Sequence, residues 1–249
     1  MLASGTIGGE GNAGGSELPS RWERPALASG ILFVVVQIAT IAFTVVFFAT
    51  THPPIDASPT EAARGFARAE TMVAVGTYLY VLQVPFLLLF LGGLFGVLRR
   101  VEGGSGALAI SVLGAGVAMV VIASMGALVS AITPTIGQLG GDGATVKAID
   151  GMTPLALALS AFPRAVLLGA TSVVLLEGRI VPRWICWTGL ALAVISLAST
   201  GTLLTPALFP FLALGTLLFV LWIAALTVAL LRNPRTVNRA EPHVEPAAT

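Results

Sequence analysis

Long apolar runs are the feature of this sequence that most restricts its fold. A helix needs about 20 apolar residues, at about 1.5 Å each, to cross the roughly 30 Å hydrocarbon core of a bilayer. In hydrocarbon every backbone N–H and C=O must be bonded within its own segment, and the runs do not alternate in polarity as barrel strands do, so we expect helices. Six runs are long enough: Leu27–Thr50, Thr71–Leu98, Gly106–Ile132, Pro154–Leu176, Trp184–Leu204 and Pro206–Leu231.

The composition agrees with an integral membrane protein of the all-α class. The 249 residues are 56% apolar and only 10% charged, whereas soluble domains carry about 25% charged residues. A net charge of +1 without a basic stripe argues against nucleic-acid binding. The single cysteine, Cys186, excludes an internal disulfide and a cysteine-based metal cage, and we expect no cofactor. The boundary between the last two runs is weak, so five spans with a re-entrant piece is the alternative to six.

The arginines of the loops predict an orientation with both termini in the cytoplasm. Cytoplasmic loops carry the excess of Arg and Lys. If the N-terminus is inside, three basic residues face outward, namely Arg64, Arg68 and Lys147. Nine then face inward: Arg21, Arg24, Arg99, Arg100, Arg179, Arg183, Arg232, Arg235 and Arg239. The two long loops, His52–Thr71 and Thr133–Thr153, are outer loops in this arrangement.

The chain divides into a leader, one membrane domain and a tail. Residues 1–26 begin with a Gly- and Ser-rich stretch and are predicted to be a disordered cytoplasmic leader. Residues 27–231 form the predicted six-helix domain, and the polar residues 232–249 form a flexible cytoplasmic tail. Twelve arginines to one lysine, with abundant Ala, Gly and Val, suggest a GC-rich bacterial genome and hence a bacterial inner membrane.

An arginine–tryptophan corner precedes the fifth run. Trp184 and Trp187 follow Arg183, and such residues favour the lipid headgroup level, so we interpret all three as an interfacial anchor. The segment Gly178–Trp184 reads G-R-I-V-P-R-W and resembles the G-x-[IV]-[LV]-P-R-W motif of bacterial membrane proteins classed as domain of unknown function 4386. The resemblance covers this motif and the layout of spans. It implies about six spans, and no reaction, cofactor or catalytic residue.

The sequence favours a non-enzymatic protein. Both histidines, His52 and His243, lie outside the runs, and no Asp or Glu lies deep within one, so proteolytic or haem chemistry lacks its residues. The phosphate-binding loop of ATPases is absent. Small residues at fourfold spacing, such as Gly189 and Ala193, are typical of helix-packing faces. The leading hypothesis is therefore a membrane protein that acts through helix packing, with the lipid bilayer and a membrane protein partner or a second copy of the chain as its contacts.

Arg164 is the anomaly of the sequence. It lies about ten residues into the fourth run, near the bilayer centre, where a charge costs about 2.5–3.5 kcal/mol. Gln37, Gln83 and Tyr80 reach comparable depth in the first two runs, and we predict that they converge on Arg164. Transporters keep their substrate sites at this level.

Three hypotheses account for the cost of this charge. Arg164 is the centre of a site for a small anion or acidic lipid headgroup in a transporter or binder. Alternatively, it is a structural clamp that bonds the glutamines and the carbonyl freed by Pro163. In the third hypothesis it snorkels to the membrane boundary or pairs with a partner's acidic residue.

Overall fold

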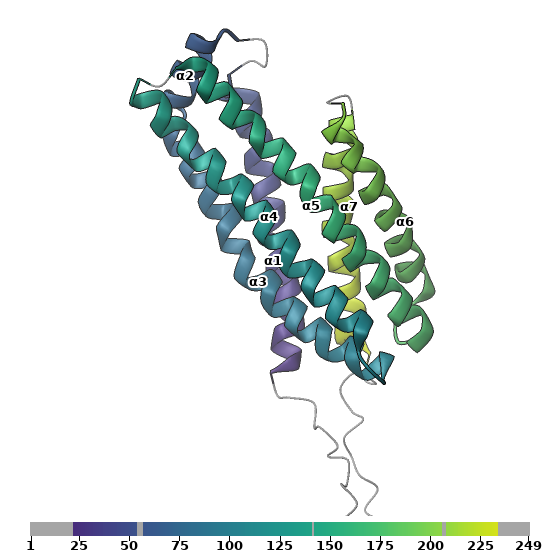
Figure 1. Cartoon of the computed structure of the whole chain (residues 1–249). Coiled ribbons are helices and arrows are strands. Elements are labelled where there is room, and N and C mark those ends of the chain that lie inside the picture. Colours follow the sequence, from purple (N-terminus) through teal and green to yellow (C-terminus); the bar gives the residue numbers. More distant parts are fainter. Residues whose placement is uncertain (1–21, 54–56, 141, 206–207, 234–249) are drawn as a thin grey trace, which may run out of the picture.

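The structure, a computed structural model, describes residues 22–53, 57–140, 142–205 and 208–233 (Figure 1). Every regular element in these ranges is helical. In chain order they are α1 (Glu23–Thr50), α2 (Pro59–Arg68), α3 (Glu70–Glu102), α4 (Ala107–Gln138), α5 (Gly143–Gly178), α6 (Arg183–Ser199), the 3₁₀ turn η1 (Thr200–Leu203) and α7 (Phe209–Arg232).

The predicted spans are confirmed as helices. Within the described residues, six helices are long and apolar enough to cross a membrane: α1, α3, α4, α5, α6 with η1, and α7. The chain is thus all-α, and the re-entrant alternative is not what is observed. Residues 1–21 and 234–249 lie outside the described ranges. The last residues of the predicted leader, from Glu23 onward, already belong to α1.

The two predicted outer loops are largely helical. Within His52–Thr71, α2 begins with Pro59 and a capping box in which the Ser58 and Glu61 side chains each bond the other residue's backbone N–H. Within Thr133–Thr153, α4 continues to Gln138 and α5 begins at Gly143, after an Asp142 cap. Hydropathy did not indicate these segments because they are too polar for lipid. Capping and contact with other helices stabilise them instead.

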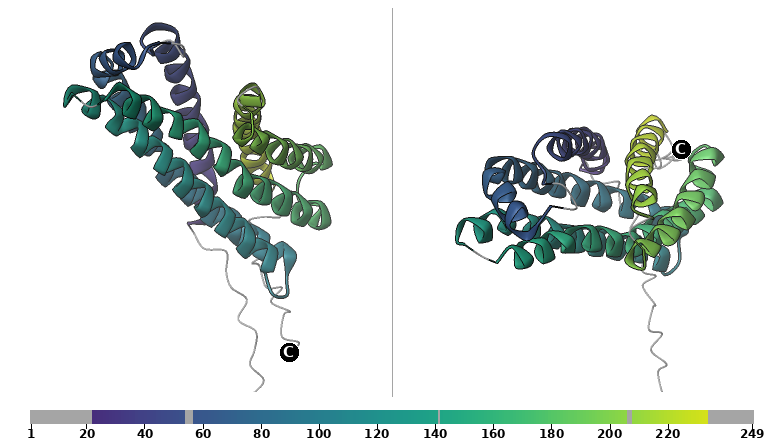
Figure 2. Two further views of the ribbon diagram at one scale, coloured as in Figure 1. Left: turned by 45° about the horizontal axis from the view of Figure 1, so that its top comes forward. Right: turned by 90° about the horizontal axis from the view of Figure 1, so that it is seen from above.

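The membrane helices pack in a closed ring. Each contacts its neighbour in the order α1, α3, α4, α5, α6, α7 and back to α1, and α5 also touches α3 (Figure 2). The end of α6 and the start of α7 lie near η1. They are apart from the end of α1, the start of α3 and the end of α4, which lie near α2 (Figures 1 and 2). The starts of α1 and α6 and the ends of α3, α5 and α7 gather at the opposite end of the ring (Figure 1).

Small residues allow the close helix contacts. Gly30 of α1 faces α3 and α7, where a Cβ would lie 2.5 Å from Thr227 Oγ1 and 2.6 Å from Phe90 Cδ2. Gly189 of α6 faces Ser172 of α5, which a Cβ would overlap. Lipid gives helices little reason to associate, so this close backbone approach holds the ring together. Large apolar side chains on the outer faces, such as Val35 and Val45 of α1, are exposed and form the lipid-facing surface.

Candidate functional site

Arg164 lies in α5 and points into the protein. Its side chain is only 4% exposed, although the residue is charged and lies about 21 Å along the helix from Gly178. Pro163 precedes it inside the helix, where a proline lacks the N–H that would bond the carbonyl of Leu159. The guanidinium is therefore held away from both water and lipid.

One nitrogen of Arg164 is bonded to α7. Nη1 donates a hydrogen bond to Thr216 Oγ1 at 2.8 Å, and that hydroxyl donates to the carbonyl oxygen of Leu212 at 2.9 Å. The Phe219 ring lies one turn further along α7, with its centroid 6.0 Å from Arg164 Cζ, at the limit of a cation–π contact. Thr216 uses its only hydroxyl proton for Leu212, which leaves its oxygen free to accept from the arginine.

The other two nitrogens of Arg164 have no partner. Nε and Nη2 are both buried and make no hydrogen bond to the protein. The ion pairs within the described residues join His52 to Asp150 and Arg100 to Glu23, so no carboxylate there neutralises Arg164. Leaving a buried donor unsatisfied costs about 1–3 kcal/mol, and more when the group is charged. The site is therefore short of hydrogen-bond acceptors and of negative charge.

Apolar residues are buried on both sides of Arg164 along α5. A small cluster of buried residues, Ala158 and Ala161 of α5 with Leu212 of α7, packs on the side toward the start of α5. Leu167 and Leu168 belong to the main core on the other side, and both are fully buried. In such a low-dielectric position electrostatic interactions are strong, whether with a fixed partner or with a ligand.

The predicted partners of Arg164 are not bonded to it. Gln83 of α3 is 4% exposed, but its Oε1 has no hydrogen-bond partner. Gln37 of α1 and Tyr80 of α3 are half-buried, and no hydrogen bond joins either to Arg164. The convergence of the two glutamines and the tyrosine on Arg164 therefore stays a prediction, while the observed acceptor is Thr216.

Thr216 was missed because its signal in the sequence is weak. It is one of two threonines in α7, with Thr227, and threonines in membrane helices usually bond their own backbone. Thr40 and Thr44 of α1 do this, with hydrogen bonds to the carbonyls four residues earlier. Only the packing of α7 against α5 distinguishes Thr216 from them.

The predicted interfacial anchor lies at the start of α6. Arg183 is the first residue of the helix, directly after Pro182. Trp184 and Trp187 are 58% and 61% exposed, so neither packs into the core. Their exposure at a helix end is compatible with the headgroup level, which stays a prediction for these three residues.

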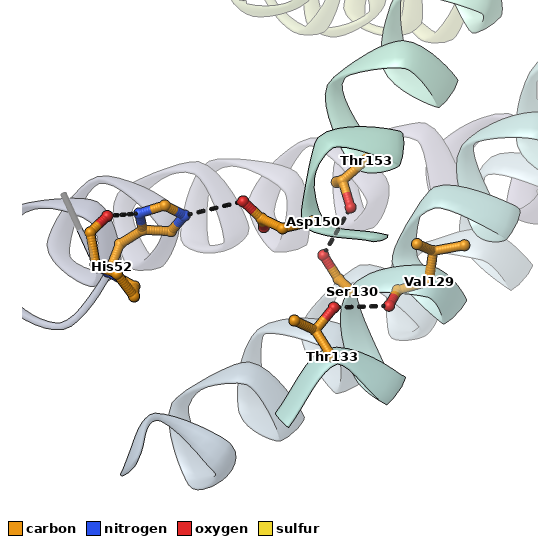
Figure 3. A network of polar contacts seen from close by, with 7 residues as sticks. His52, Val129, Ser130, Thr133, Asp150 and Thr153 are labelled. Atoms are coloured by element: carbon orange, nitrogen blue, oxygen red, sulfur yellow. Dashed lines mark hydrogen bonds and ion pairs between the residues drawn. The ribbon is translucent and has the colours of Figure 1, made fainter. Parts of the chain in front are cut away.

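A second polar cluster lies at the end of the ring that carries α2 (Figure 3). His52 Nε2 lies 3.7 Å from Asp150 Oδ2 of α5, and His52 Nδ1 is 2.6 Å from the Pro53 carbonyl oxygen. The ring stacks on Phe48 and meets Phe47 and Phe66 edge-on. Burial alone lowers the pKa of His52, but the contacts with Asp150 and Pro53 outweigh it and raise the pKa above 6.5. Ser130 and Thr153 bond each other nearby, at 3.1 Å, and join α4 to α5.

The fold and the apolar outer surface define the chain as a multi-pass transmembrane helical protein in contact with a lipid bilayer. Comparison with family models, curated proteins and solved structures found no match to it. Among the described residues, no group of three or more His, Cys, Asp or Glu side chains is arranged to hold a metal ion.

Proposed function

We propose that this protein binds an anion, either a small soluble one or an acidic lipid headgroup, inside the membrane at Arg164. The observation that carries the proposal is the pair of buried, unpartnered nitrogens on a charged side chain. An anion supplies both the missing acceptors and the missing charge. In a transporter or a membrane receptor, a site of this kind would bind the anion that is carried or sensed.

The contacts of Arg164 favour an anion over the alternatives. A purely structural clamp is best served by acceptors on all its nitrogens, yet only Nη1 has one. Pairing with another membrane protein requires a guanidinium on the surface, whereas Arg164 is 4% exposed. Snorkelling to the boundary requires the same exposure. In this proposal the packing of the helices holds Arg164 in place and so forms the binding site.

The proposal includes a non-enzymatic role, a bacterial inner membrane and cytoplasmic termini. The orientation rests on charge: Arg99, Arg100, Arg179 and Arg183 lie at the end of the ring opposite α2. Arg64, Arg68 and Lys147 lie in or beside α2 at the other end. Because cytoplasmic loops carry the arginine excess, the α2 end faces outward. The composition of the chain, with twelve arginines to one lysine, supports the bacterial source.

The decisive measurement is thermal stability of the purified protein in zwitterionic lipid nanodiscs, for the wild type and for Arg164→Leu. A ligand at 100 times its Kd stabilises a protein by about 2.7 kcal/mol. We expect one or more anions, or nanodiscs that contain an acidic lipid, to raise the Tm of the wild type and to leave that of Arg164→Leu unchanged.

The opposite result is equally clear. If no anion or acidic lipid shifts the wild type, and Arg164→Leu lowers its stability, then Arg164 is a clamp and the proposed function is wrong. Where binding is found, anion flux into proteoliposomes separates a transporter from a receptor.

A further inference from the structure

We infer that the ligand of Arg164 is an oxyanion of the carboxylate or phosphate class, held by two parallel hydrogen bonds from Nε and Nη2 beside Gly215. This inference rests on the proposed function and names the chemistry of its ligand. It follows from which nitrogens are unpartnered and from what lies next to them.

The two unpartnered nitrogens lie on one edge of the guanidinium. Nη1, on the same side of the group as Cδ, is bonded to Thr216. Nη2 lies on the opposite side, where one of its N–H bonds runs parallel to the N–H of Nε. Both nitrogens of this edge are buried and lack acceptors. The unused part of Arg164 is therefore a complete fork, the arrangement that binds carboxylate or phosphate through two oxygens.

Two acceptor atoms suit this fork better than one. The two oxygens of a carboxylate, or two oxygens of a phosphate, each take one N–H along its own direction. A halide offers a single centre, which cannot lie on both N–H axes at once. The fork therefore predicts a preference for an oxyanion over chloride, beyond the attraction of the charge itself.

Gly215 of α7 lies beside this edge. A Cβ on Gly215 would be 3.9 Å from Arg164 Nη2 and 3.7 Å from Ile195 Cγ2 of α6, which are ordinary contact distances. Alanine therefore fits here without overlap, but its methyl group would be in contact with Nη2, at one end of the fork. With glycine at this position no side chain of α7 contacts Nη2 from residue 215, so we infer that Gly215 helps to determine whether the ligand fits.

Gly169 of α5 provides a matched control. A Cβ there would be 3.8 Å from Ala193 Cβ, again an ordinary contact, and no atom of Arg164 is among its near neighbours. Gly169→Ala and Gly215→Ala thus make the same chemical change on helices of the same ring. They differ in whether the new methyl group faces the fork.

The experiment measures affinity from ligand-dependent Tm shifts in phosphatidylcholine nanodiscs with acetate, inorganic phosphate or chloride, and in nanodiscs containing phosphatidic acid. In the wild type we expect acetate, phosphate or phosphatidic acid to bind about tenfold more tightly than chloride. A tenfold difference in affinity corresponds to about one charge-assisted hydrogen bond. Gly215→Ala should lose that advantage and Gly169→Ala should keep it. Arg164→Lys, which keeps the charge but has no fork, should also lose it.

The comparison of these ligands distinguishes a lipid headgroup from a soluble anion and shows whether the inference is wrong. A response to phosphatidic acid without a response to free acetate or phosphate assigns the oxyanion to a lipid headgroup, and the reverse assigns it to a soluble ligand. Equal affinity for chloride and oxyanions, unchanged in Gly215→Ala, overturns the inference and leaves the proposed function intact. Absence of any anion response in the wild type overturns both.

Discussion

Trp222 of α7 donates a hydrogen bond from Nε1 to the backbone carbonyl oxygen of Ile185 in α6, at 2.8 Å. The indole is 3% exposed and lies beside Gly189, one turn after Ile185, so the bond forms where α5, α6 and α7 meet. This contact ties α7 to the first turn of α6, and it lies in the same core that continues to Leu168 and Phe219 near Arg164.

Trp222→Phe should weaken the contact between α6 and α7. The substitution removes the indole N–H and leaves most of the apolar packing. Hydrogen bonds between membrane helices contribute about 0.6 kcal/mol on average and at most about 1.7. We expect a loss of about 1 kcal/mol or less in unfolding free energy, measured by denaturant titration in mixed micelles. A loss of several kcal/mol would instead point to collapse of the packing.

Gly189→Ala should be more costly. Its new methyl group overlaps Ser172 Oγ and comes within 2.9 Å of Trp222 Nε1, so these side chains or the helices that carry them must shift. Overpacking of this kind costs about 1–3 kcal/mol. In the same titration Gly169→Ala, with its nearest contact at 3.8 Å, should change stability far less.

Ser172→Ala provides a second check on this contact. The Ser172 hydroxyl is buried without a hydrogen-bond partner, so its removal alone should be neutral or slightly stabilising. Combined with Gly189→Ala, it should recover part of the lost stability. If the double variant is no better than Gly189→Ala alone, the overlap with Ser172 is not the cause of the loss.

The six spans were predictable because the requirement they meet is local. A run of about 20 apolar residues identifies itself, whatever it packs against. The outer segments were not predicted, since α2 and the start of α5 depend on the Ser58 and Asp142 caps and on neighbouring helices. Arg164 was recognisable as a charge in an apolar run. Its acceptor Thr216 was not, because nothing in a sequence pairs residues of different helices.

The contact between His52 and Asp150 should make stability depend on pH. The pKa of His52 is raised in the folded protein, so its proton is held more tightly there than in the unfolded chain. The contribution is fully present below the ordinary value of 6.5 and is lost as pH rises through the raised folded pKa. Unfolding free energies across neutral pH should therefore decline at the upper end. Asp150→Asn should flatten this decline, and a decline of the same size in that variant would assign it to other groups.

The proposed orientation can be tested by labelling with a membrane-impermeant maleimide. The natural Cys186 is 1% exposed and should not react, and a Cys186→Ala background removes it entirely. Leu139, which is 82% exposed beyond α4, lies at the end we assign to the outside. Ser105 lies in the loop between α3 and α4 at the other end.

In that background, Leu139→Cys should be labelled on intact cells, whereas Ser105→Cys should be labelled only after permeabilisation. The reverse pattern would invert the orientation while leaving the fold unchanged.

The bond between Arg164 and Thr216 also sets an order of events during synthesis. The two residues are 52 positions apart, so the ribosome completes α5 well before it makes α7. At about 5–20 residues per second, the delay amounts to several seconds. During that interval the new arginine helix has no α7 to receive it, and lipid alone is a poor environment for its charge. We therefore expect α5 to settle in its final position only after the last two helices are made, so that folding of this protein depends on its C-terminal third.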